Sequence, residues 1–138
     1  MFFVVVLSSN CAAQGKSPVY VDAVVGDGDN VGQIYVFNLK EAIRGSQSFR
    51  LIEDNKQRPY IRVSITTRDA MSGNSSAIGY ALAYDSSTTA MAGILISSGV
   101  QTCGRQVTAP CAQDLLPWID RAIDQLRQYE PKLHQTLK

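Results

Sequence analysis

Cys103 and Cys111 are the residues of this 138-residue chain whose type and spacing most clearly indicate chemistry. They enclose a short segment that contains Gly104 and Pro110. The spacing differs from the Cys-x-x-Cys motif of redox enzymes, and one histidine with three scattered cysteines offers too few ligands for a usual zinc site. We therefore predict a structural disulfide between Cys103 and Cys111, which stabilises the fold by about 2–3 kcal/mol in the chain-entropy model.

A glycine-rich segment resembles a nucleotide-binding fingerprint, because Gly26, Gly28 and Gly32 follow an apolar run and precede a helical pattern. The third glycine is displaced by one residue from the motif. Asp27 and Asp29 would also place negative charge where a pyrophosphate must bind. The sequence therefore argues against a dinucleotide cofactor.

The same segment partly matches a calcium-binding loop. Asp27, Asp29 and Gly32 occupy the first, third and sixth places of the EF-hand pattern. Val31 and Asn38 stand at the fifth and twelfth places, where oxygen ligands are required, so the bidentate glutamate is missing. We expect no metal site here, and interpret the acids as favouring the start of a helix.

Other candidate catalytic groups are sparse. Glu53 and Asp54 lie beside basic residues in what reads as a solvated, charged turn. The single histidine, His134, lies almost at the C-terminus, where chain ends fray. Because Ser-His-Asp and Cys-His mechanisms need a firmly held histidine, the sequence disfavours these hydrolases. We predict no catalytic, cofactor-binding or metal-binding residues.

The net charge excludes some partners. Lysine and arginine total 13 and aspartate and glutamate total 12, which gives a charge of +1. No basic excess favours nucleic acid, and no stacking platform with interleaved basic residues is evident. Tyr80 and Tyr84 share one face of an expected strand, where they either line a groove or pack across strands.

The first residues indicate export. Phe2–Leu7 is an unbroken apolar run, and small residues follow it. This is the pattern of a signal peptide, so we predict a signal over residues 1–13, cleaved after Ala12 or Ala13, and a linker over residues 14–18. The alternative is a buried first strand.

Two kinds of membrane attachment fit the sequence less well than a cleaved signal. An integral span is not expected, since crossing a bilayer takes about 20 apolar residues. A lipid anchor at Cys11 is the weaker alternative, because Ser8, Ser9 and Asn10 differ from the residues that usually precede a lipidated cysteine.

The remaining pattern alternates between strands and helices. Val19–Val25 predicts a strand, and residues 31–44 predict a helix capped by Asp29 or Asn30 and ended by Gly45. A short strand follows at Ser48–Ile52. Three strands with period-two alternation cover residues 61–66, 78–84 and 91–101, and a second amphipathic helix contains Leu115, Ile119 and Leu126, with Pro117 in its first turn.

These elements predict a single α+β domain over residues 19–138. We expect a mainly antiparallel sheet with two helices on one face, in the order β-α-β-β-β-β-α. Its core is predicted to combine strand and helix residues: Ile61, Val63, Ile65, Leu82, Ile94, Leu39, Ile43, Ile119 and Ile123.

Two segments and the element order resemble the N-terminal domain of TolB and related modules of bacterial envelope lipoproteins. They are Leu39–Leu51, with its L…I..S..F.L pattern, and Gly79–Asp85, with the sequence GYALAYD. The resemblance implies a protein-binding or assembly role in the cell envelope, with no catalytic residues to carry over.

We therefore expect a non-catalytic, exported or envelope-associated module that binds a protein or another macromolecule. The alternative is a small-molecule or lipid carrier with a pocket between helix and sheet, and a hydrolase comes third. A wide apolar cavity would favour the carrier, whereas an exposed apolar patch or an open sheet edge would favour the binding module.

Overall fold

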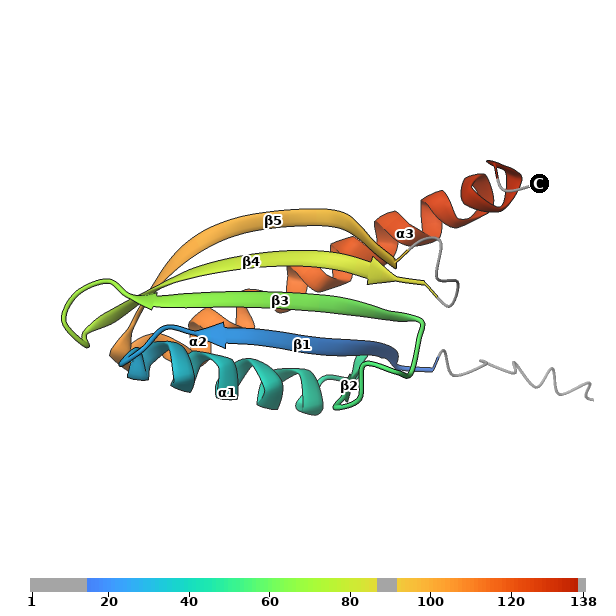
Figure 1. Ribbon diagram of the computed structural model, residues 1–138. Coiled ribbons are helices and arrows are strands. Elements are labelled where there is room, and N and C mark those ends of the chain that lie inside the picture. The colour runs from blue at the N-terminus through green and yellow to red at the C-terminus, as the bar shows by residue number, and fades with distance from the viewer. Residues whose placement is uncertain (1–14, 87–91, 137–138) are drawn as a thin grey trace, which may run out of the picture.

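The computed structural model describes residues 15–86 and 92–136 (Figure 1). The expected signal segment, including Cys11, lies outside the described residues. The elements follow the predicted order, with a short helical insertion before the last helix: β1 Ser17–Val25, α1 Asn30–Gly45, β2 Phe49–Ile52, β3 Tyr60–Asp69, β4 Ser75–Asp85, β5 Ala92–Gly104, a 3₁₀ turn η2 at Arg105–Val107, α2 Thr108–Gln113 and α3 Leu116–Thr136. The strand β1 begins at Ser17, within the segment expected to be a linker.

The strands form one mixed sheet in the order β2-β1-β3-β4-β5. This confirms the predicted α+β class, and the structure adds that the sheet is mixed, because parallel pairs join its larger antiparallel part. β1 pairs in parallel with both β2 and β3, and only β3, β4 and β5 form the antiparallel meander. The reason is that α1 carries the chain back across the sheet, and a strand–helix–strand connection makes its two strands parallel.

The helices lie on one face of the sheet and leave the other face open (Figure 1). The predicted core is largely present between the two layers. Ile61, Val63 and Ile65 on β3 face Leu39 and Ile43 on α1, and Leu82 and Ile119 join the same cluster. Ile123 is partly buried against it.

Ile94 is an exception to the predicted core. Ile94 is only half-buried and lies outside the core cluster, whereas Ile96 packs against the core cluster. The pairing of β4 with β5 shifts its register between Leu82 and Ala83, and again between Tyr84 and Asp85. Such a bulge changes which residues of a strand face the core, and simple alternation along the sequence does not reveal it.

The start of α1 is fixed by its cap. Asp29 is the N-cap, and its Oδ1 accepts a hydrogen bond from the backbone N–H of Gly32 at 2.8 Å. The buried residues Val31, Tyr35, Leu39 and Ile43 then recur every four residues, which places them on the sheet-facing side of the helix. The helical pattern was correctly predicted, and of the two predicted caps, Asp29 and Asn30, the structure has Asp29.

Candidate functional site

The outer edge of β5 is the most distinctive surface of the described chain. β5 is 13 residues long and forms one border of the sheet. Its sequence, AGILISSGVQTCG, contains no charged residue and no proline. Each of the other four strands of the described sheet carries at least one charged side chain. Native edge strands are usually protected by charge, proline or short length, so the β5 edge is unusually open to pairing.

The opposite border of the sheet is protected. β2 has only four residues and carries Arg50. Glu53 directly follows β2, and its Oε1 contacts Nη2 of Arg44 on α1 at 2.7 Å. Glu41 also pairs with Arg44, so charge surrounds this short edge. Further strand pairing is therefore favoured at β5 and disfavoured at β2.

The backbone groups that point outward from β5 follow from its pairing with β4. The N–H of Arg105 donates to the carbonyl of Asn74 at 2.9 Å, and the ladder continues with Ser75 opposite Gly104. Because hydrogen-bonded and non-hydrogen-bonded pairs alternate in an antiparallel ladder, every second residue directs its N–H and C=O away from β4. In the regular part of β5 these are Ser98, Val100 and Thr102.

Apolar side chains flank this row of backbone groups. On the open face of the sheet, the side chains of Val100 and Leu95 are 79% and 62% exposed. On the helix side, Gly99 lies against Tyr80, whose ring is 6.3 Å from that of Trp118. Trp118 is 43% exposed, and the Arg121 guanidinium lies 5.2 Å from its ring centre. Both sides of the edge thus offer apolar contact area.

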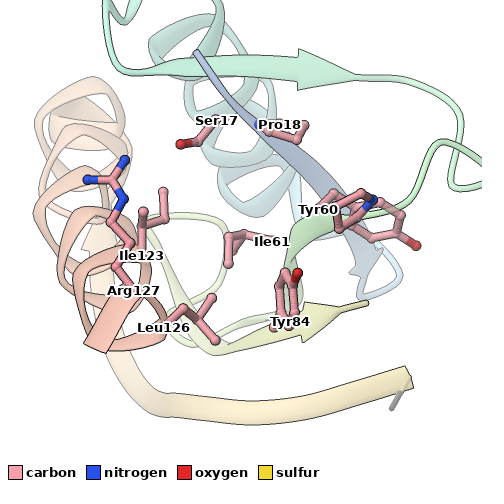
Figure 2. Close-up of a pocket in the computed structure, with 9 residues that line it drawn as sticks. Ser17, Pro18, Tyr60, Ile61, Tyr84, Ile123, Leu126 and Arg127 are labelled. Carbon is pink, nitrogen blue, oxygen red and sulfur yellow. The ribbon is translucent and has the colours of Figure 1, made fainter. Parts of the chain in front are cut away.

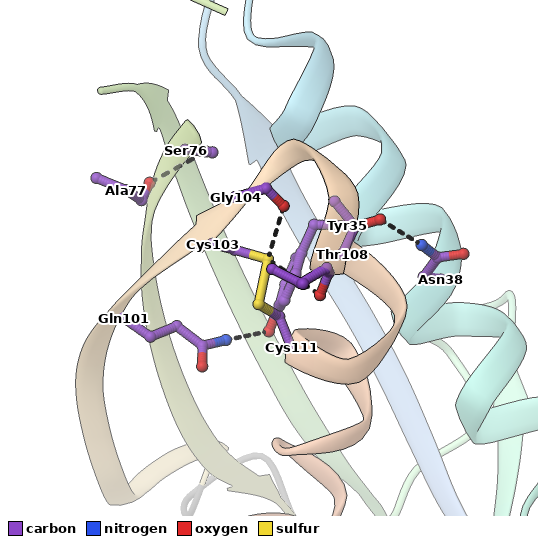
Figure 3. Close-up of a disulfide and its surroundings, with 10 residues drawn as sticks. Tyr35, Asn38, Ser76, Ala77, Gln101, Cys103, Gly104, Thr108 and Cys111 are labelled. Atoms are coloured by element: carbon purple, nitrogen blue, oxygen red, sulfur yellow. Dashed lines mark hydrogen bonds between the residues drawn. A yellow bond between two sulfur atoms is a disulfide. The ribbon is translucent and has the colours of Figure 1, made fainter. Parts of the chain in front are cut away.

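The end of β5 is held in place by a covalent bond and by hydrogen bonds. The predicted disulfide is present: Cys103 and Cys111 are bonded, with their Cα atoms 6.1 Å apart, and tie β5 to α2 (Figure 3). Gln101 Nε2 donates to Tyr35 Oη at 2.7 Å, which links β5 to α1. This support makes the β5 edge a preformed surface, and preformed surfaces lose less conformational entropy on binding.

In the glycine-rich loop, the carboxylate of Asp29 is used to hold the fold together. Both carboxylate oxygens of Asp29 are engaged, since Oδ2 accepts from Ser76 Oγ at 2.6 Å and Oδ1 accepts from Gly32. Burial alone raises the pKa of Asp29, but the hydrogen bonds from Ser76, Thr67 and Gly32 outweigh it and lower the pKa below its ordinary value. Within the described part of the chain, no three His, Cys, Asp or Glu residues are grouped to hold a metal ion.

The two acids of the charged turn both make local contacts. Glu53 pairs with Arg44, and Asp54 Oδ1 accepts from the backbone N–H of Lys56 at 2.8 Å, so both acids stabilise local structure. The side chain of His134 lies outside the described residues.

A small pocket lies between α3 and one end of the sheet (Figure 2). Its volume is about 170 Å³, and Tyr60, Ile61, Tyr84 and Leu126 are among the residues that line it. Arg127 lies at its rim and contacts Asp124 at 3.6 Å. The groove suggested for Tyr80 and Tyr84 together is not formed, because Tyr80 packs against Trp118 while Tyr84 lines this separate pocket.

Sequence reasoning did not identify β5 as the exposed edge. The strand itself was predicted, but its position at the border depends on how β1 inserts between β2 and β3. One signal was available in the sequence: residues 92–104 form the longest strand and carry no charge. An uncharged strand is usually central in a sheet, so this pattern would have predicted a central position for residues 92–104 rather than an edge.

Comparisons with known proteins do not assign the chain to a family. No family model matches it, and no curated protein matches it. Among solved structures, a PelC dodecamer from Paraburkholderia phytofirmans has a TM-score of 0.44 and 12% sequence identity, over 74% of this chain and 83% of that chain. This likeness is too weak to carry an argument about function, and the resemblance to the TolB N-terminal domain stays a prediction. Within the described residues, no helix is both long and apolar enough to cross a bilayer.

Proposed function

We propose that this protein is a non-catalytic binding module that recruits a protein partner by strand pairing at the outer edge of β5. The observation that carries the proposal is the combination of length, absence of charge and exposed apolar flanks at this edge. Main-chain hydrogen bonds would supply affinity, and the flanking side chains Val100, Leu95 and Trp118 would supply selectivity.

The geometry supports the binding module better than the carrier. Sites for drug-sized ligands are about 300–1,000 Å³, and a lipid chain needs a comparable cavity. The pocket beside α3 is about 170 Å³, which matches a single ring or one branched side chain. A carrier that used this pocket between helix and sheet would therefore have to open the contact between α3 and the sheet before it could load its ligand.

A photo-crosslinking residue placed at position 100 tests this function in the native host. Val100 lies at the β5 edge, so its replacement should give covalent adducts with a protein. Val24 provides the matched control, because it is also an exposed valine, at 65%, but lies on β1, away from the β5 edge. Adducts at position 100 and none at position 24 support the proposal. Equal adducts at both positions, or none at position 100, would overturn it.

The proposal includes export. The disulfide supports it, since structural disulfides persist mainly in oxidising compartments. N-terminal sequencing of protein recovered from the host envelope or medium should give a mature start between Ala12 and Lys16. Recovery of the protein with Met1 intact would contradict cleavage.

A further inference from the structure

The open edge of β5 has a regular stretch whose middle residue is apolar and exposed. From Ser97 to Gly104 the ladder with β4 runs without interruption, and the register shifts begin only beyond Ser97. Val100 lies at the middle of this stretch and is the most exposed of the large apolar residues described. A strand that pairs with β5 over its regular part would therefore be centred on Val100.

We propose that the partner at this edge is a second copy of the chain, with the two β5 strands antiparallel and Val100 facing Val100 across a two-fold axis. This inference rests on the proposed function, because it uses the same surface and names its occupant. Antiparallel pairing about Val100 places Ser98 opposite Thr102 of the second copy, and Gly99 opposite Gln101. The two five-stranded sheets would then join into one continuous sheet.

Charge is the first argument for a second copy. When a strand pairs with a second copy of itself, its side chains lie opposite side chains of the same sequence. Any charge on the strand is then brought close to a like charge, and like charges placed opposite one another are destabilising. β5 carries no charge from Ala92 to Gly104, so this repulsion does not arise. An edge that selected a different protein through charge complementarity would need charged side chains, and β5 has none to offer.

The orientation of the backbone is the second argument. Ser98, Val100 and Thr102 direct their N–H and C=O groups outward, because the Arg105–Asn74 bond sets the alternation along the ladder. In the register centred on Val100, these outward groups face the same groups of the other copy. Each outward donor then meets an acceptor without a shift of register.

Closure is the third argument. A head-to-tail arrangement would have to join β5 to β2, and β2 is only four residues long with Arg50 and the Arg44–Glu53 pair beside it. Pairing β5 with β5 uses the same patch on both copies, so the assembly stops at two subunits. The exposed Trp118 on the helix layer extends the contact beyond the strands.

Molar mass in solution tests the inference directly. The chain has a mass of 15.0 kDa, so light scattering during gel filtration should show twice that value, falling toward the monomer on dilution. Val100→Lys places a like-charge pair on the two-fold axis and should give a monomer at all concentrations. Val24→Lys makes the same exposed change away from the edge and should leave the dimer intact.

Cysteine crosslinking tests the register. In a background with Cys11→Ser, Val100→Cys should form an intermolecular disulfide under mild oxidation, since directly opposed Cα atoms lie about 4.5–5.5 Å apart, within the disulfide range. Thr102→Cys alone should not crosslink, because its own copy lies about four residue steps away, on the order of 13 Å. A mixture of Ser98→Cys and Thr102→Cys chains should crosslink again.

The outcomes separate this inference from the function on which it rests. A wild-type monomer throughout, or a dimer that survives Val100→Lys, would overturn self-pairing. Self-pairing in this register would also be overturned if Thr102→Cys alone crosslinked as much as Val100→Cys. If position 100 still captures a different protein in the host in that event, the binding function stands and only the identity of the partner is wrong.

Discussion

Ser76 on β4 donates a hydrogen bond from its Oγ to Oδ2 of Asp29, the cap of α1, over 2.6 Å. Both residues are buried, so this bond joins the first turn of the helix to the N-terminal end of β4 in an environment with little water. The other carboxylate oxygen accepts from Gly32, and the charged form of Asp29 is thereby held in place.

The contribution of Asp29 to stability should depend on pH. Burial raises the pKa of Asp29, but its hydrogen bonds lower it overall from 3.8, so the ionised form is favoured in the folded state. A lowered folded-state pKa contributes stability that is present above the unfolded pKa and is lost as the pH falls through the folded pKa. The difference in unfolding free energy between wild type and Asp29→Asn should thus be largest at neutral pH and shrink below about pH 4. Urea unfolding at several pH values measures it, and a constant difference across this range would contradict the assignment.

Gly32→Ala should destabilise the protein by about 1–3 kcal/mol. A Cβ at this position would overlap the side chains of Thr67 and Asp29, so α1 could no longer approach the sheet as closely. Gly45→Ala is the matched control in the same helix, because a Cβ there has open space. The control should be neutral or stabilise by up to about 1 kcal/mol, since alanine favours helix. Equal effects in thermal or urea unfolding would show that Gly32 is not a point of close contact.

Ile119→Ala should cost about 2–5 kcal/mol of unfolding free energy. Ile119 on α3 is fully buried in the core cluster, and truncating it leaves a cavity between α3 and the sheet. Ile34→Ala removes the same atoms from a half-exposed position on α1 and should cost much less. Urea unfolding of both variants gives the comparison. If the two losses were similar, α3 would not bury this face.

Reduction of the Cys103–Cys111 bond should lower stability by about 2–3 kcal/mol, because the bond restricts a short loop of the unfolded chain. The fold should survive, since most members of the core cluster are residues other than these two cysteines. Thermal melts with and without reductant measure the loss, and circular dichroism checks the fold. Thiol titration of oxidised protein that finds both cysteines free would contradict the bridge.

Tyr35 should titrate only in strongly alkaline solution. Burial raises its pKa to about 12, while its hydrogen bond with Gln101 lowers it in part. Because the folded pKa lies above the unfolded value, the neutral phenol is favoured in the fold, and this stability is complete below about pH 10 and declines as the pH rises through about 12. Ultraviolet titration of wild type against Tyr35→Phe should assign one late transition to this residue. A titration curve unchanged by Tyr35→Phe near pH 12 would overturn the assignment.

The sequence by itself determined the elements whose cause is local. The four-residue spacing of Val31, Tyr35, Leu39 and Ile43 produced α1, and Asp29 capped it because a side-chain carboxylate can reach the N–H of Gly32. The period-two alternation along β3 placed Ile61, Val63 and Ile65 in the core for the same reason. The pairing of Cys103 with Cys111 also followed from short-range spacing.

Only the tertiary structure decided the features that depend on non-local pairing. No local pattern states that β1 inserts between β2 and β3, and this insertion makes the sheet mixed and puts β5 at its border. The register shift opposite Leu82 likewise exchanged Ile94 for Ile96 in the core. The candidate binding edge arises from the same cause: side chains specify a strand locally, but strand order alone decides whose backbone groups remain open for a partner.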